Sequence, residues 1–157
     1  MTPICPARDG AVYFPIGDNV HDTYRSGVDA TDGTAVVNYG NYGILYQINI
    51  PTAGRVQTRY FLSPLGGVYA GAIRAVSGTK KRLVETPSLR PYFGDQTRPE
   101  SAQAAQARAE GRLLLTEYTE LADLGTYSSD QSVQFEYSPP GASNLPVNII
   151  LMPEDQR

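Results

Sequence analysis

The stretch that decides the fold is ILYQINIPTAGRVQTRYFL, residues 44–62. Its first half places every second residue on one face of an extended strand, and this face carries Ile44, Tyr46, Ile48 and Ile50, opposite Leu45, Gln47 and Asn49. Such alternation is typical of a half-buried strand. After Pro51 and the turn Thr52-Ala53-Gly54, a second strand places Val56, Thr58, Tyr60 and Leu62 inward. Two such runs around a short glycine-containing turn predict a β-hairpin.

Extended patterns recur on both sides of this stretch. They predict further short strands at 11–16, 35–38, 68–76, 83–86, 113–118, 132–137 and 147–152. The tandem Asn38-Tyr39-Gly40 and Asn41-Tyr42-Gly43 supplies positions that can adopt positive φ. A content of 15 Gly, 12 Pro and 11 Tyr is typical of strands joined by tight turns. About eight strands are therefore expected.

Residues 99–110 depart from this pattern. They are strong helix formers without a large apolar side chain, so they predict one peripheral helix. The chain of 157 residues is long enough for one domain with its own core. We expect an all-β fold, an antiparallel β-sandwich or jelly roll. Residues 1–10 form an N-terminal arm, 11–152 the domain and 153–157 a polar tail.

The charge and the patterning of the chain disfavour several classes of function. A net charge of −3 and a pI near 5.1 argue against nucleic-acid binding, which needs a basic face. No apolar run approaches the length of a transmembrane helix, so no membrane insertion is expected. The glycines at 66, 67 and 71 lack the pattern of a phosphate-binding loop.

Cys5 and His21 are the single cysteine and the single histidine of the chain. One cysteine forms neither an intramolecular disulfide nor a thiolate cluster for zinc. A Cys–His nucleophile would need the two residues to meet, and nothing in the sequence places them together. We interpret Cys5 as a free thiol and His21 as a polar loop or strand residue.

Residues 17–33 are polar and rich in aspartate, so we expect a long loop there. Asp18, Asp22, Asp29 and Asp32 are the candidate calcium ligands, because calcium prefers several oxygen ligands. Their spacing does not match an EF-hand, and aspartate is also common in solvated turns. Both interpretations stay open, and calcium is the only cofactor considered.

Exposed tyrosines are the second candidate site. Tyr39, Tyr42 and Tyr69 offer flat aromatic surfaces, and Asn38 and Asn41 offer hydrogen-bonding groups beside them. Sugar rings stack on such surfaces, and protein interfaces also favour them. Packing of these rings in the core or in turns is the competing interpretation. By contrast, Tyr46 and Tyr60 are in phase with apolar neighbours and are expected in the core.

A third hypothesis is hydrolysis by paired carboxylates. It requires a cleft that gathers Asp18, His21 or Asp22 with a glutamate near a strand, such as Glu117, Glu120 or Glu136. Sequence spacing cannot show whether such side chains converge.

Three blocks carry a resemblance to a known family: NYGILYQINIPT (41–52), LSPLGGVYAG (62–71) and FEYSPPGASNLPV (135–147). Their sequence resembles that of a β-domain of secreted surface proteins of Gram-positive bacteria, often found beside copper-amine-oxidase-like N-terminal modules. The resemblance implies an extracellular, non-catalytic domain associated with the wall or matrix. It carries over no catalytic residues.

Together these observations predict a structural or interaction domain of the bacterial cell surface that can self-associate. Its expected partners are itself or other surface proteins. Carbohydrate or cell-wall binding through tyrosines is the alternative, and a hydrolase is the second alternative. The sequence shows no secretory signal, so a cytoplasmic location stays open beside an extracellular one.

Overall fold

The computed structural model describes residues 4–53, 57–64, 69–86, 121–128, 131–141, 143 and 145–154. These residues form an all-β fold, which confirms the predicted class. In chain order the elements are α1 (Pro6–Asp9), β1 (Val12–Ile16), β2 (Arg25–Val28), β3 (Ala35–Asn38), β4 (Tyr46–Asn49), β5 (Gln57–Pro64), β6 (Gly71–Ser77), β7 (Lys80–Thr86), β8 (Ala122–Ser128), β9 (Gln134–Tyr137) and β10 (Val147–Pro153).

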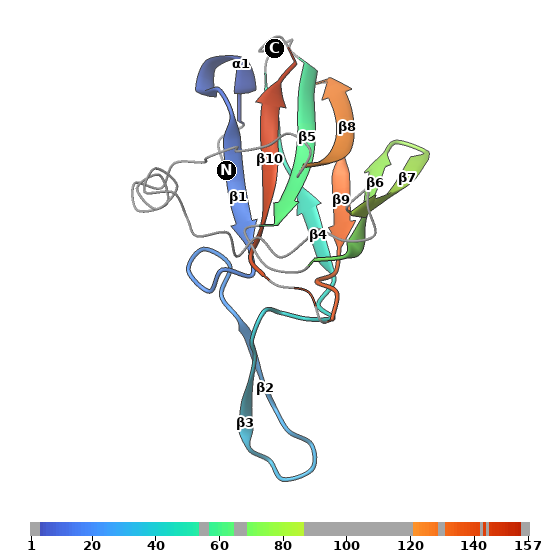
Figure 1. The fold of residues 1–157 in the computed structure, drawn as a ribbon. Coiled ribbons are helices and arrows are strands. Elements are labelled where there is room, and N and C mark those ends of the chain that lie inside the picture. Colours follow the sequence, from blue (N-terminus) through green and yellow to red (C-terminus); the bar gives the residue numbers. More distant parts are fainter. Residues whose placement is uncertain are drawn as a thin grey trace.

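The described strands form three antiparallel sheets (Figure 1). One four-stranded sheet has the order β1-β10-β5-β8, and a second has the order β4-β9-β6-β7. The third sheet contains only β2 and β3. In Figure 1 this two-stranded ribbon extends away from the other sheets, so most of its length stands clear of them.

The predicted hairpin of residues 44–62 is wrong in its pairing. Both strands exist, but β4 pairs with β9, where Ile48 lies opposite Phe135, and β5 pairs with β10, where Leu62 lies opposite Ile149. Alternation specifies which face of a strand is buried, and strands of two different sheets satisfy it equally well. The connection after β4 instead meets the N-terminal arm, because Ile4 N donates to Pro51 O at 2.9 Å and Ala53 N donates to Ile4 O at 2.8 Å.

Side chains of both four-stranded sheets share one core. Tyr60 of β5 and Phe135 of β9 join the sheets, with ring centroids 5.2 Å apart. The buried members of the core are Ile16, Tyr60, Leu62, Tyr69, Ile73, Ala75, Val84, Ala122, Leu124, Val133, Phe135, Tyr137, Val147, Ile149 and Leu151. Tyr60 is therefore a core residue as predicted, whereas Tyr46 is half-buried and packs against the core.

Strand β10 lies between β1 and β5 and is buried on both faces. Ile149 and Leu151 belong to the core, and Ile150, which points to the opposite face, is also fully buried. Its continuous apolar run is what a central strand covered on both sides requires. At the edge of the same sheet, β1 carries Pro15, as expected for an edge strand.

Strands β6 and β7 form a hairpin through Gly78 and Thr79. Gly78 has a φ of 58°, and a positive φ at the first turn position suits a two-residue hairpin loop. At the start of β6, a Cβ on Gly71 would lie 2.9 Å from Cγ of Pro140. The absence of a side chain at Gly71 therefore allows Pro140 to pack closely against the start of β6.

Two of the described strands are not predicted from the sequence. Residues 17–33 were expected to be a loop, but Arg25–Val28 form β2 and pair with β3. Strand β8 includes Gly125 with a φ of 104°, where the register with β5 shifts, and this irregularity interrupts alternation. The predicted helix 99–110 and the predicted strand 113–118 lie outside the described residues.

Candidate interaction surface

The β2–β3 ribbon, residues 25–38, is the most exposed pair of strands among the described residues. Its two strands contribute eight residues in four cross-strand pairs, and seven of these residues, including every residue of β2, are exposed. Val28 is 68% exposed and Val37 is 45% exposed. A two-stranded ribbon is marginally stable in water by itself, so its exposed valines favour contact with another surface.

The register divides the ribbon into two unlike faces. Val28 lies opposite Ala35, and Ser26 lies opposite Val37, so these four side chains share one face. Arg25 lies opposite Asn38, and Gly27 lies opposite Val36, so these residues share the other. The first face is therefore the more apolar.

Asn41 fixes the root of the ribbon, defined here as residues 23–25 and 38–42. Its side chain is fully buried, and its φ is 55°. Its Oδ1 accepts a hydrogen bond from Arg25 N at 2.7 Å, and its Nδ2 donates to Thr23 O at 3.2 Å. A buried amide with these bonds holds the backbone where it enters β2.

Asn38 and Tyr42 close the root on the β3 side. Asn38 Oδ1 accepts from Tyr42 N at 3.0 Å, and Asn38 Nδ2 donates to Tyr42 O at 2.9 Å. The Tyr42 hydroxyl donates to Ser143 O at 2.6 Å. The root is thereby attached to the loop before β10, while the strands of the ribbon remain exposed.

The loop between β1 and β2 is attached to the body of the domain through Asp22. Its Oδ2 accepts from Gly17 N at 2.7 Å and from the Tyr46 hydroxyl at 2.7 Å. Asn41 Nδ2 in turn donates to the Tyr46 oxygen at 2.7 Å. Burial raises the pKa of Tyr46 to about 12, and the bond to the Asp22 carboxylate adds to this, so the phenol keeps its proton as a donor.

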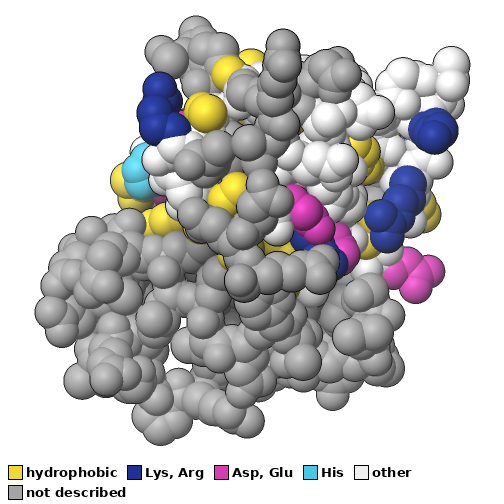
Figure 2. All heavy atoms as spheres, turned by 90° about the horizontal axis from the view of Figure 1, so that it is seen from above, with side chains coloured by type: hydrophobic (Ala, Val, Ile, Leu, Met, Phe, Trp, Pro, Cys, Tyr) yellow, Lys and Arg dark blue, Asp and Glu magenta, His cyan; other side chains and the backbone are white. Residues whose placement is uncertain are grey.

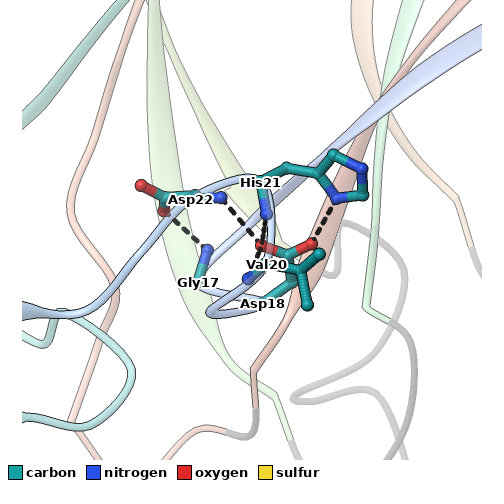
Figure 3. Close-up of polar contacts among 5 residues, drawn as sticks. All are labelled: Gly17, Asp18, Val20, His21 and Asp22. Atoms are coloured by element: carbon teal, nitrogen blue, oxygen red, sulfur yellow. Dashed lines mark hydrogen bonds and ion pairs between the residues drawn. The ribbon is translucent and has the colours of Figure 1, made fainter.

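Asp18 organises the turn that precedes Asp22 (Figure 3). Its Oδ1 accepts from the backbone N–H groups of Val20, His21 and Asp22 at 3.1, 2.9 and 2.8 Å. Its Oδ2 lies 2.7 Å from Nδ1 of the exposed His21 ring. Burial raises the pKa of the Asp18 carboxyl, but these hydrogen bonds outweigh it and lower the pKa to about 2.

The structure does not bring Cys5 and His21 together. Cys5 precedes β1 and His21 follows it, so the two residues lie beyond opposite ends of that strand. Cys5 has a free thiol, and its backbone N donates to Asp9 Oδ2 at 2.9 Å.

The four candidate calcium ligands fall into two separate groups. Asp18 and Asp22 lie in the loop after β1, whereas Asp29 and Asp32 lie at the tip of the ribbon. Asp29 and Asp32 each accept hydrogen bonds from a threonine two residues later, as aspartates do in turns. Within the described residues, no group of three His, Cys, Asp or Glu side chains is placed to hold a metal ion.

The candidate tyrosines differ in exposure. Tyr39 is 71% exposed and makes an edge-to-face contact with Tyr24, with ring centroids 5.7 Å apart. Tyr42 is 38% exposed. Tyr69 is fully buried, and its hydroxyl donates to Tyr137 at 2.9 Å, so it offers no face for stacking. The amides of Asn38 and Asn41 are engaged by the ribbon root, as described above.

The carboxylates considered for hydrolysis do not meet in one cleft of the described structure. Glu136 of β9 forms an ion pair with Arg74, its cross-strand partner in β6. Asp18 and Asp22 bind backbone groups and Tyr46 in the loop after β1. Glu117 and Glu120 lie outside the described residues.

Seen from the end opposite the ribbon, the described surface carries side chains of mixed type (Figure 2). Acidic and basic side chains both occur there. Strand β7 contributes the consecutive basic residues Lys80, Lys81 and Arg82, all exposed.

Comparison with protein-family models, with curated proteins and with solved structures finds no match for this chain. The resemblance to bacterial surface β-domains therefore rests on the three sequence blocks alone. Among the described residues, no helix has the length and apolar character needed to cross a membrane.

Proposed function

We propose that this chain is a non-catalytic β-sandwich domain of the bacterial cell surface that contacts protein partners through its β2–β3 ribbon. The carrying observation is the contrast between the ribbon and its root. Val28 and Val37 are exposed along the ribbon, while the fully buried Asn41 holds the root to the domain. An exposed apolar element on a fixed support is suited to binding a partner with little loss of conformational entropy.

The finer elements of the proposal have separate support. The contact of Tyr60 with Phe135 across the two four-stranded sheets supports the sandwich. The three sequence blocks support the location at the cell surface. Asp18 accepts a hydrogen bond from the backbone of the turn, and Asp22 accepts one from the Tyr46 hydroxyl. These contacts support a structural role for both carboxylates.

A second candidate function is carbohydrate binding, which the 71% exposure of Tyr39 favours. Tyr42, at 38% exposure, lies three residues further along the same root. Exposed aromatic rings serve sugar stacking and protein interfaces alike. The two functions differ in which substitution abolishes binding.

Retention of the purified protein on Gram-positive wall preparations separates them. One preparation keeps its surface proteins, and the other is stripped of protein by protease. The proposal expects retention on the first only, with loss in a Val28→Lys, Val37→Lys variant and normal retention in Leu83→Lys. Leu83 is a matched control because it is a 66% exposed apolar residue on β7, outside the ribbon.

Retention on the stripped walls that is lost in Tyr39→Ala would instead establish carbohydrate binding. Absence of retention on both preparations would overturn binding to the resident proteins of the wall, and equal retention of the valine variant and the wild type would overturn the ribbon as the binding surface.

A further inference from the structure

We propose that the partner of the ribbon is a second copy of this chain, and that two β2 strands pair antiparallel about a two-fold axis. This inference rests on the proposed function, since it uses the same ribbon. It would join the two ribbons into a four-stranded intermolecular sheet in the order β3-β2-β2-β3. Strand addition of this kind uses main-chain hydrogen bonds for affinity and side chains for register.

The outer edge of β2 is available for this pairing. Within the described residues, β2 pairs only with β3. Just beyond β2, Asp29 N donates to Thr34 O at 2.9 Å and therefore points toward the β3 side. Backbone groups alternate in direction along a strand, so those of Ser26 and Val28 point away from β3. These are the groups that a second strand would bind.

Three of the other described edge strands, β1, β7 and β8, carry features that oppose such pairing, whereas β3 and β4 contain neither proline nor lysine. Edge strand β1 contains Pro15, and edge strand β7 contains Lys80, Lys81 and Arg82 in succession. Edge strand β8 contains the register shift near Gly125. Proline, lysine and bulges at edges discourage pairing with another chain. β2 contains neither proline nor lysine, and its four-residue length favours a reversible association over a permanent one.

Opposite charges favour one register for the two paired β2 strands. In a two-fold arrangement with Gly27 facing Gly27 of the second copy, Ser26 faces Val28, and Arg25 faces Asp29. Ser26 and Val28 then exchange the outward main-chain hydrogen bonds, which agrees with the alternation derived above. Arg25 and Asp29 form two symmetric opposite-charge pairs, and such cross-strand pairs stabilise antiparallel sheets.

The same register fits the shape and polarity of the ribbon. Gly27 at the axis has no side chain to obstruct close approach of the two backbones. Val28, Ala35 and Val37 lie on one face of each ribbon, so pairing makes these two apolar strips continuous. The strand that was expected to be loop thereby becomes the centre of the interface.

Sedimentation velocity of the purified full chain over a wide concentration range tests the association. All proteins carry Cys5→Ser to exclude a disulfide through that thiol. We expect a monomer–dimer equilibrium, a dissociation constant raised about tenfold or more by Arg25→Glu or Asp29→Arg, and recovery to within about threefold of the parent in the double charge reversal. Asp32→Arg is the control, because Asp32 makes the same kind of turn bond as Asp29 but has no Arg25 opposite it.

Disulfide trapping tests the register independently of these charges. A Cβ on Gly27 would have only Val36 Cγ2 nearby, at 4.0 Å, so Gly27→Cys is compatible with the folded ribbon. With Cys5→Ser, we expect Gly27→Cys to oxidise to a covalent dimer at least tenfold faster than Thr79→Cys, an exposed control in the β6–β7 turn.

A monomer at every concentration, or dimerisation unaffected by both single charge reversals, would overturn the inference. Equal trapping rates at positions 27 and 79 would do the same. If the protein is monomeric but its retention on protein-bearing walls still depends on Val28 and Val37, the proposed function stands and only the identity of the partner changes.

Discussion

The Tyr46 hydroxyl donates a 2.7 Å hydrogen bond to Asp22 Oδ2 and accepts a 2.7 Å hydrogen bond from Asn41 Nδ2. This relationship between Tyr46 and Asp22 connects the first residue of β4 to the loop that leads into the ribbon. The stability of the exposed β2–β3 ribbon therefore depends on the half-buried side chain of Tyr46.

Replacing Tyr46 with phenylalanine tests this dependence. The change leaves Asp22 and Asn41 without a shared partner, so we expect the free energy of unfolding to fall by about 1–2 kcal/mol. Chemical denaturation measures the loss, and hydrogen exchange should show faster exchange at the amides of residues 23–25. Tyr39→Phe is the control, because its ring is 71% exposed, and it should change stability by no more than about 0.5 kcal/mol. Equal effects of the two substitutions would contradict the prediction.

Asn41 combines buried hydrogen bonds with a φ of 55°, and two substitutions separate these contributions. Asn41→Gly removes the side-chain bonds but tolerates the backbone conformation, so we expect a loss of about 2 kcal/mol. Asn41→Ala also introduces left-handed strain, which adds about 1 kcal/mol. The free energy of unfolding, measured at equilibrium, should therefore be highest for the wild type, lower for the glycine variant and lowest for the alanine variant. A reversed order of the two variants would show that φ does not matter here.

Close packing around Gly71 predicts that an alanine at this position destabilises the fold. A Cβ at this position would lie 2.9 Å from Pro140 Cγ and 3.2 Å from the Tyr69 hydroxyl oxygen. Gly71→Ala should therefore destabilise the fold by about 1–3 kcal/mol, measured as a lower denaturation midpoint. Gly141→Ala is a matched control beside the same proline, because nothing lies within 4 Å of a Cβ there. The idea fails if the two alanine variants unfold at the same denaturant concentration.

Asp18 gives a pH dependence with a defined sign. Its pKa falls from an ordinary 3.8 to about 2 in the folded chain, so the folded state binds the proton less readily than the unfolded state. The resulting stabilisation is fully present above the unfolded value and is lost as the pH falls from about 4 through about 2. The difference in unfolding free energy between the wild type and Asp18→Asn should therefore shrink over this range.

Urea unfolding in a series of acidic buffers measures this difference. In a His21→Ala background the three backbone donors to Asp18 remain, so the pH dependence should persist with reduced size. A difference that stays constant across the series would rule out Asp18 as its source.

The sequence predicts the class of fold and the buried faces better than it predicts which strands pair. The alternation through residues 44–62 correctly places Tyr60 and Leu62 in the core, yet β4 and β5 belong to different sheets. The alternation of apolar and polar residues in a strand shows which of its faces is buried. Which strands pair with it depends on contacts between residues that are distant in the sequence. The tandem Asn-Tyr-Gly segments illustrate the reverse case, since positive φ is a local property and is confirmed at Gly40, Asn41 and Gly43.

The candidate site was harder to predict for a physical reason. Arg25 to Val28 have no alternating pattern because neither face of β2 is covered by the domain. Only the apolar Val28, placed opposite Ala35 by the ribbon turn, distinguishes this segment from a solvated loop. The burial of Tyr69 likewise depends on its partner Tyr137, which lies 68 residues away in the chain.

The position of β10 has a consequence for synthesis on the ribosome. β10 is made after the other described strands, yet it lies between β1 and β5 and pairs with both. At about 5–20 residues added per second, the nascent chain carries β1 and β5 for several seconds before their common neighbour emerges. During that interval the sheet has a gap between β1 and β5, so the completion of β10 is the event that closes it. A chain truncated before residue 147 would therefore leave β1 without its described partner and β5 with one neighbour missing. Exposed strand edges of this kind are recognised by chaperones and proteases.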